Sequence, residues 1–136
     1  MKTFSKEGVI MAQYSTEQQA YIKAMRRDIL KARMLSGTDC YVVAGFGGDT
    51  YYCYVGEGKG YQGSPFFPAT TRAICFGNEY EAKKHCYTGY RNGNGKGDLL
   101  DLHPVKASEF FTKIADDQQK QLDWAIDMWN KNVGKQ

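Results

Sequence analysis

The sequence predicts an α+β fold: a single compact domain in which a small, mainly antiparallel sheet of about four strands is flanked by N- and C-terminal helices, in the order α-β-β-β-α-β-α. Apolar residues recur at helical spacing near both ends of the chain. Between them, two aromatic and aliphatic stretches flank a glycine-containing turn, which is typical of a β-hairpin. The length of 136 residues fits one hydrophobic core. We expect residues 1–13 to be a flexible leader and residues 14–136 to form the domain.

The first helix is predicted from Thr16 to Leu35. Ser15 and Gln18 form a capping-box pattern, in which each side chain bonds a backbone N–H at the start of the helix. The apolar positions that follow recur at helical spacing: Tyr21, Ile22, Met25, Ile29, Ala32 and Leu35. Gly37 then ends the helix.

A hairpin follows, in which DCYVVAGF and TYYCYVG are the two strands. With Gly48 and Asp49 as the turn residues, the alternation of strand side chains sets three cross-strand pairs on one face: Val42 with Val55, Ala44 with Cys53, and Phe46 with Tyr51. The other face carries Tyr41, Val43, Tyr52 and Tyr54. A sheet with apolar residues on both faces is either covered twice or presents aromatic rings to a partner.

Beyond the glycine-rich stretch GEGKGYQG, the pattern predicts a third strand from Thr70 to Phe76. Asn78 and Glu81 then resemble another cap pair, so a short helix is expected through Thr88, ended by Gly89.

The last part of the chain is expected to hold a loop, a fourth strand and a long helix. The loop covers residues 91–98, and the strand LLDLH after it ends at Pro104. Ser108 is expected to cap the helix, which runs to about Lys131. Its apolar stripe contains Phe111, Ile114, Leu122, Ala125, Ile126 and Trp129.

The formal net charge of +3 is too small to indicate nucleic-acid binding by itself, so the distribution of charge matters more. Residues 1–38 hold seven Lys or Arg against three Asp or Glu, whereas the rest of the chain is balanced. No apolar run suggests a membrane span, and the first residues lack the apolar core of a secretory signal. We therefore expect a cytoplasmic protein that does not enter membranes.

Four groups of residues are candidates for ligand binding. Lys23, Arg27 and Lys31 follow one ridge of the first helix and could contact phosphates. The tyrosine face of the hairpin could stack on bases or anchor a protein interface. The two glycine-rich loops match neither a Walker nor a dinucleotide template, but their side chains could close over a ligand. The complete candidate set is Lys23, Arg27, Lys31, Tyr41, Tyr52, Tyr54, Lys59, Tyr61, Arg91 and Lys96.

No catalytic or metal-binding residues are predicted, and no cofactor is expected. The four cysteines contain no C-x-x-C pair, and such thiols are usually small buried hydrophobes. Cys40 and Cys53 share a predicted strand face, so oxidation could bridge them. His85 and Cys86 are consecutive on a predicted helix and point about 100° apart, which prevents them from forming a catalytic pair together.

The sequence thus predicts a non-catalytic binding protein for an anionic ligand, either nucleic acid or nucleotide, or for a protein surface. An inhibitor or adaptor of viral or mobile-element type, which binds a nucleic-acid-handling protein, is the first alternative. An enzyme that uses one cysteine and one histidine brought together by the fold is the second.

Overall fold

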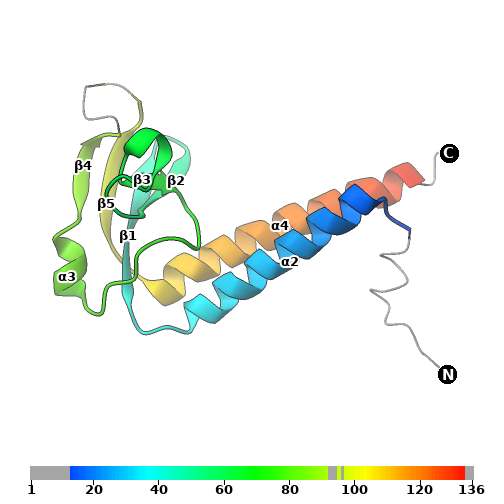
Figure 1. Cartoon of the computed structure of the whole chain (residues 1–136), viewed down its shortest axis with the longest axis horizontal. Coiled ribbons are helices and arrows are strands. Elements are labelled where there is room, and N and C mark those ends of the chain that lie inside the picture. The colour runs from blue at the N-terminus through cyan, green and yellow to red at the C-terminus, as the bar shows by residue number, and fades with distance from the viewer. Residues whose placement is uncertain (1–12, 92–94, 96, 134–136) are drawn as a thin grey trace.

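The computed structural model describes residues 13–91, 95 and 97–133, and within these a long helix lies near each end of the chain, with the strands of an antiparallel sheet between them in sequence (Figure 1). The predicted leader, residues 1–13, lies outside the described residues except for Gln13. The elements in chain order are α2 (Thr16–Ser36), β1 (Tyr41–Gly47), β2 (Thr50–Tyr54), the short 3-10 helix η1 (Tyr61–Gly63), β3 (Phe66–Pro68), α3 (Glu79–Lys83), β4 (Tyr87–Tyr90), β5 (Leu99–Lys106) and α4 (Ala107–Val133). The α+β class is therefore confirmed.

The five strands form one curled sheet in the order β3-β2-β1-β5-β4, with every neighbouring pair antiparallel. The predicted hairpin register is confirmed, because Ala44 faces Cys53 and Phe46 faces Tyr51. Gly48, in the turn, has a φ of 59°, a conformation that glycine adopts without strain. The central hairpin is thus the part of the sheet that local sequence determined best.

The third strand was predicted in the wrong place. The edge of β2 is occupied by β3, Phe66–Pro68, where no strand was predicted. Residues 70–76 instead form no strand; they make one isolated bridge, Tyr41 with Phe76, and the Ile74 N–H donates to the Tyr54 carbonyl. A proline in β3 is tolerated because this strand lies at the edge, where one row of N–H groups has no neighbour.

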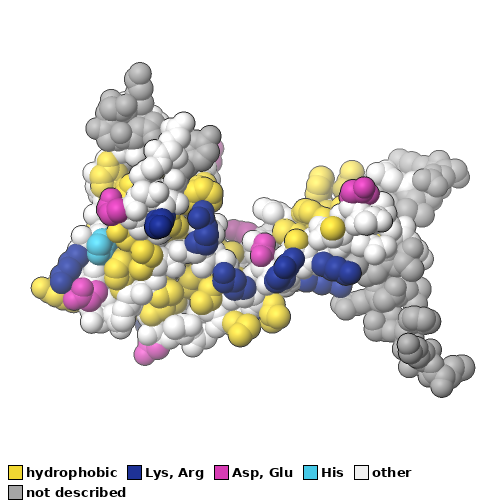
Figure 2. Space-filling model, viewed as in Figure 1, with side chains coloured by type: hydrophobic (Ala, Val, Ile, Leu, Met, Phe, Trp, Pro, Cys, Tyr) yellow, Lys and Arg dark blue, Asp and Glu magenta, His cyan; other side chains and the backbone are white. Residues whose placement is uncertain are grey.

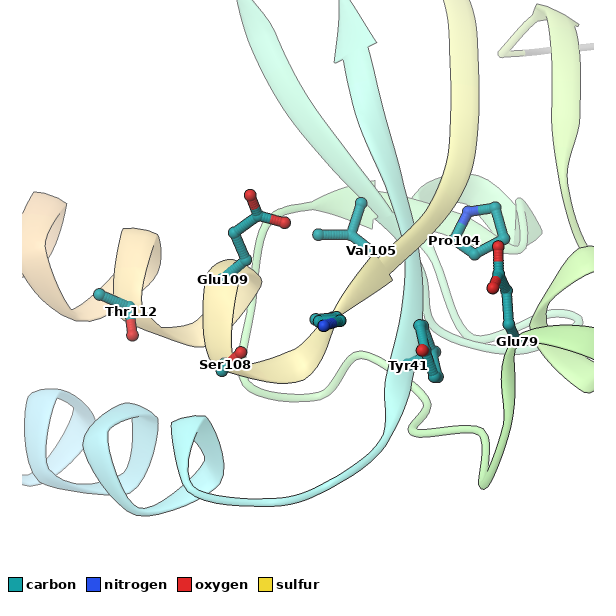
Figure 3. A pocket seen from close by; sticks show the side chains of 8 residues that line it. Tyr41, Glu79, Pro104, Val105, Ser108, Glu109 and Thr112 are labelled. Atoms are coloured by element: carbon teal, nitrogen blue, oxygen red, sulfur yellow. The ribbon is translucent and has the colours of Figure 1, made fainter.

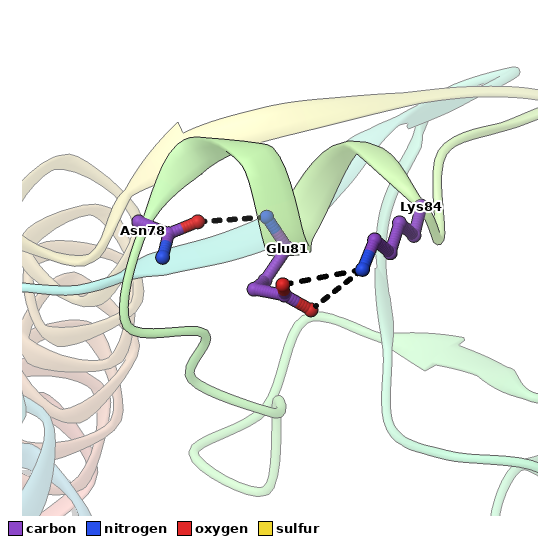
Figure 4. A network of polar contacts seen from close by, with 3 residues as sticks. All are labelled: Asn78, Glu81 and Lys84. Carbon is purple, nitrogen blue, oxygen red and sulfur yellow. Dashed lines mark hydrogen bonds and ion pairs between the residues drawn. The ribbon is translucent and has the colours of Figure 1, made fainter.

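The second predicted helix is also too long. α3 ends at Lys83, and the expected helical residues Tyr87 and Thr88 belong to β4, which pairs with β5 at the opposite edge of the sheet. The first half of the predicted cap pair is confirmed, because the Asn78 side chain accepts a hydrogen bond of 2.8 Å from the Glu81 N–H, whereas the Glu81 carboxylate pairs with Lys84 (Figure 4). Strand pairing with β5 therefore prevails over the local helical pattern.

The predicted last strand continues through Pro104, and the predicted cap of the last helix is wrong. Pro104 lies opposite Val43 of β1, while β4 ends opposite Leu102. Proline has no N–H to donate, and at Pro104 the β4 side of β5 is not paired with another strand. The proline therefore costs no strand hydrogen bond, and β5 continues to Lys106. α4 begins directly at Ala107, which places Ser108 within its first turn.

The sheet is covered on both faces, so the apolar pattern on each side of the hairpin is explained by burial. The first core lies between the sheet and the two long helices, and includes Val42, Cys53, Phe110 and Phe111. The second core lies on the opposite face and is formed by Val43, Tyr52, Tyr54, Phe66, Ala82, Leu100 and Leu102.

α2 and α4 lie side by side and extend well beyond the sheet (Figure 1). We call this helix pair the stalk. Near its outer end the Tyr14 hydroxyl donates a hydrogen bond of 2.7 Å to Asn130 Oδ1. The rings of Tyr14 and Tyr21 meet Trp129 edge to face at 5.6 and 5.7 Å. A pair of helices can bury only one stripe of each, so the remaining faces of the stalk are open to solvent.

Candidate functional site

The most distinctive surface of the molecule is the outer face of α2. The helix starts as the sequence predicts, with both hydrogen bonds of the Ser15 and Gln18 capping box formed. Ile22, Ile29 and Ala32 are buried, which directs the opposite side of the helix to solvent. Helical periodicity places one mixed set of side chains on that opposite side: Lys23, Arg27, Leu30, Lys31 and Met34. We call this set the basic ridge.

The basic ridge combines cations with exposed apolar side chains. Lys23, Arg27 and Lys31 are all exposed, and Figure 2 shows Lys and Arg side chains in a row along the stalk. Leu30 and Met34, four residues apart, are 61% and 71% exposed. The sequence prediction found the three cations but missed these two residues. Their spacing could have identified them, because both fall outside the buried stripe and on the same side as the cations.

The charge of the basic ridge is not neutralised within the described part of the chain, where Lys23, Arg27 and Lys31 have no ion pair. The nearby Arg33 differs, since its guanidinium lies 2.8 Å from the Asp116 carboxylate of α4. That pair belongs to the seam between the two helices. The outward cations therefore remain available to an acidic partner.

The tyrosine face, by contrast, is part of the protein interior. Tyr52 and Tyr54 are 4% and 6% exposed, and the Tyr52 hydroxyl donates a hydrogen bond of 2.5 Å to Asp98. Burial raises the pKa of both phenols. Of the two alternatives left open by the sequence, the covered sheet is the one observed: the residues before α3, α3 itself and β4 cover that face, so the two rings present no stacking surface. Tyr41 is half-buried at the rim.

The first glycine-rich loop uses its backbone donors internally. The N–H groups of Lys59, Gly60 and Gly63 donate to carbonyls within the loop, at 3.1, 2.6 and 3.3 Å. A phosphate cradle needs such donors free and converging on one point, so these three hydrogen bonds count against one. The Lys59 side chain is exposed, whereas the Tyr61 side chain lies outside the described residues.

The second glycine-rich loop adds little to a shared site. The Arg91 guanidinium lies over the Tyr52 ring at 5.9 Å, and the Arg91 N–H bonds the Asp98 carbonyl. Lys96 lies outside the described residues. The ten predicted residues are therefore spread over separate regions, and only the three cations of α2 form one continuous described surface.

An open groove of about 630 Å³ was not predicted from the sequence. Tyr41, Pro104 and Val105 supply its apolar surface, and Glu79 and Glu109 approach from opposite sides, from α3 and α4 (Figure 3). These residues come from four elements that only the fold brings together. The groove is shallow and carries both signs of charge, since Lys106 also lines it.

The sequence left open an enzyme that uses one cysteine and one histidine brought together by the fold. Within the described residues, no group of three or more His, Cys, Asp or Glu side chains could hold a metal ion. Burial raises the pKa of Cys53 to about 11 and also raises the pKa of Cys86, which disfavours the thiolate that a nucleophile requires. His85 stacks on the Phe76 ring at 4.8 Å, and His103 pairs with Asp101 at 2.8 Å on the surface.

Comparison with known protein families, curated proteins and solved structures gave no match to this chain. Among the described residues, no helix is long and apolar enough to span a membrane. Functional inference therefore depends on the surface chemistry of the basic ridge.

Proposed function

We propose that this chain is a non-catalytic binding protein that recognises an acidic surface of a protein partner through the basic ridge of α2. One observation carries the proposal: three exposed cations without an ion-pair partner in the described chain surround two exposed apolar side chains on one helix face. Protein interfaces combine an apolar centre with a polar rim, and contiguous exposed apolar residues with charged neighbours often mark such sites.

The exposed apolar pair favours a protein partner over nucleic acid, the two classes of ligand expected from the sequence. A phosphate backbone is bound by cations and hydrogen-bond donors, and the apolar side chains of Leu30 and Met34 offer it neither. A protein partner would cover both side chains. Removing their apolar surface from water would favour binding by about 25 cal/mol for each Å² buried. The surrounding cations would orient acidic groups and speed the encounter.

Nucleic acid is the second candidate, favoured by the regular spacing of the cations. Positions four residues apart on a helix are separated by about 6 Å along the axis, so the three charges could follow a phosphate chain. This candidate leaves the exposure of Leu30 and Met34 unexplained.

The test compares capture of cellular partners by four forms of the full chain: the native chain, two ridge variants and one control. In the first variant Lys23, Arg27 and Lys31 are changed to Glu, and in the second Leu30 and Met34 are changed to Ser. A matched control changes three other exposed cations to Glu, namely Lys59, Lys106 and Lys120, which alters the net charge by the same amount.

We expect one protein to be captured by the native chain and the control, to survive nuclease treatment, and to be lost with both ridge variants. Equal capture by all forms would exclude the basic ridge as the site. Capture that disappears after nuclease treatment, or that depends on the cations but not on Leu30 and Met34, would identify nucleic acid instead.

A further inference from the structure

The fold brings together two cysteines that are far apart in the sequence. Cys40 directly precedes β1, and Cys75 lies in the segment between β3 and α3. Tyr41 and Phe76, the residues that follow them, exchange two backbone hydrogen bonds of 2.8 and 2.7 Å. Because the bridge is antiparallel, Cys40 and Cys75 lie diagonally across it, with their side chains on the same face. The bridge therefore holds the two thiols near each other on one face.

The two thiols differ in their access to solvent. Cys40 is 7% exposed and packs in the first core, whereas Cys75 is exposed. Burial, followed by the interaction with the neighbouring Cys75 thiol, raises the pKa of Cys40 to about 12. An oxidant in solution therefore meets Cys75 first, and Cys40 lies behind it as the second thiol.

We propose that Cys40 and Cys75 form a reversible redox pair, in which a hydroperoxide closes a disulfide between the start of β1 and the segment that leads into α3. In the first step, the Cys75 sulfur attacks the peroxide, the O–O bond breaks, and a sulfenic acid and water form. In the second step, the Cys40 sulfur attacks the sulfenic sulfur, the S–O bond breaks, and a second water leaves. Two thiols and one hydrogen peroxide thus give one disulfide and two waters, and a dithiol reductant reverses the change by exchange.

The partner of Cys40 differs from the one the strand pattern suggested. Cys40 and Cys53 do share the first core, as that pattern predicts. Cys53, however, is 0% exposed, so an oxidant has no direct access to it. Cys86 is exposed, but its thiol contacts the Ala82 carbonyl on α3 at 3.9 Å.

Closing the disulfide would stabilise the fold, because it restricts the unfolded chain across residues 40–75. The loop-closure model gives an unfolding equilibrium constant lowered by roughly a hundredfold or more for a loop of this length. Tyr41 and Glu79, which line the groove, flank the two joined segments. Oxidation would therefore also fix one wall of the groove relative to the other.

The experiment treats the purified full chain with hydrogen peroxide, alkylates the remaining thiols and measures intact mass and peptide maps. We expect two thiols to become protected, a mass loss of about 2 Da before alkylation, and one cross-linked peptide pair that joins Cys40 to Cys75. Dithiothreitol should restore all four thiols. The urea midpoint should rise in the oxidised form.

Two variants of exposed cysteines make the result decisive. Cys75→Ser should abolish the cross-link and the rise in the urea midpoint, and Cys86→Ser should leave both unchanged; circular dichroism confirms that each is folded. The proposal is overturned if Cys75 is oxidised to sulfinic acid while Cys40 still alkylates. A cross-link from Cys40 to Cys53, or only disulfides between molecules, would overturn it equally.

Discussion

The outer end of the stalk offers a direct test of how the helix pair is stabilised. Trp129 of α4 is partly buried against the first core and receives the rings of Tyr14 and Tyr21 at its edges. Trp124, on the same helix, is 66% exposed. The two tryptophans therefore provide a matched pair of substitutions, Trp129→Ala and Trp124→Ala, in which the same atoms are removed from different surroundings.

The expected magnitude follows from what each ring contacts. Complete burial of a large apolar side chain contributes about 1.5–3 kcal/mol to the free energy of unfolding. Because the Trp129 ring is only partly buried, we expect its burial to contribute about 1.5 kcal/mol. Each edge-to-face aromatic pair adds at least about 0.5 kcal/mol, and Trp129 makes two. We therefore expect Trp129→Ala to lower the free energy of unfolding by about 2.5 kcal/mol. Trp124→Ala should change it by less than about 0.5 kcal/mol.

Urea unfolding followed by circular dichroism at the helix band is the suitable assay, because it does not depend on tryptophan emission. The Trp129 substitution should lower the urea midpoint by roughly 1–2 M. Amide hydrogen exchange would show whether the loss is confined to the outer turns of α2 and α4. Equal destabilisation by the two substitutions, or a larger effect at Trp124, would refute this account of the stalk.

Two further predictions concern the sheet. A Cβ at Gly45 would overlap the Asp101 carbonyl of β5, so Gly45→Ala should cost more than about 3 kcal/mol; Gly77→Ala, with open space around it, should stay within about 0.5 kcal/mol in the same urea assay. Burial raises the pKa of Cys53 from 9.0 to about 11 and raises the pKa of Tyr52, so these groups keep their protons in the folded state after the unfolded chain has released them. Stability should therefore fall as pH rises from about 9 to 11, and a urea midpoint that stays constant over that range would contradict it.

Local sequence predicted the elements whose signals lie within one segment. The Ser15 cap, the turn at Gly48 and the apolar stripe of α4 each depend on neighbouring residues, and each was confirmed. The strands that failed depend on partners distant in sequence. β3 exists because the edge of β2 is free, and β4 exists because β5 offers an edge that the residues after α3 can reach.

Among the candidate site residues, too, local spacing could place some, whereas the position of others depends on distant segments. Lys23, Arg27 and Lys31 could be placed on one surface by helical spacing alone. The exposure of Tyr52 and Tyr54 could not be predicted, because a hairpin that is apolar on both faces does not indicate which of them other segments cover. The proximity of Cys40 and Cys75 was also beyond prediction, since it depends on a single bridge between segments more than thirty residues apart.

The architecture separates the parts of the chain that stabilise the fold from the surface proposed for recognition. Both faces of the sheet are covered by the protein itself, so its aromatic residues contribute to stability and leave little for a partner. The stalk extends beyond the sheet, and each of its helices buries one stripe against the other. Apolar residues outside that stripe, such as Leu30 and Met34, have no interior place within the described fold. Substitutions there should leave stability nearly unchanged, so a loss of partner binding in the ridge variants would report on contact and not on unfolding.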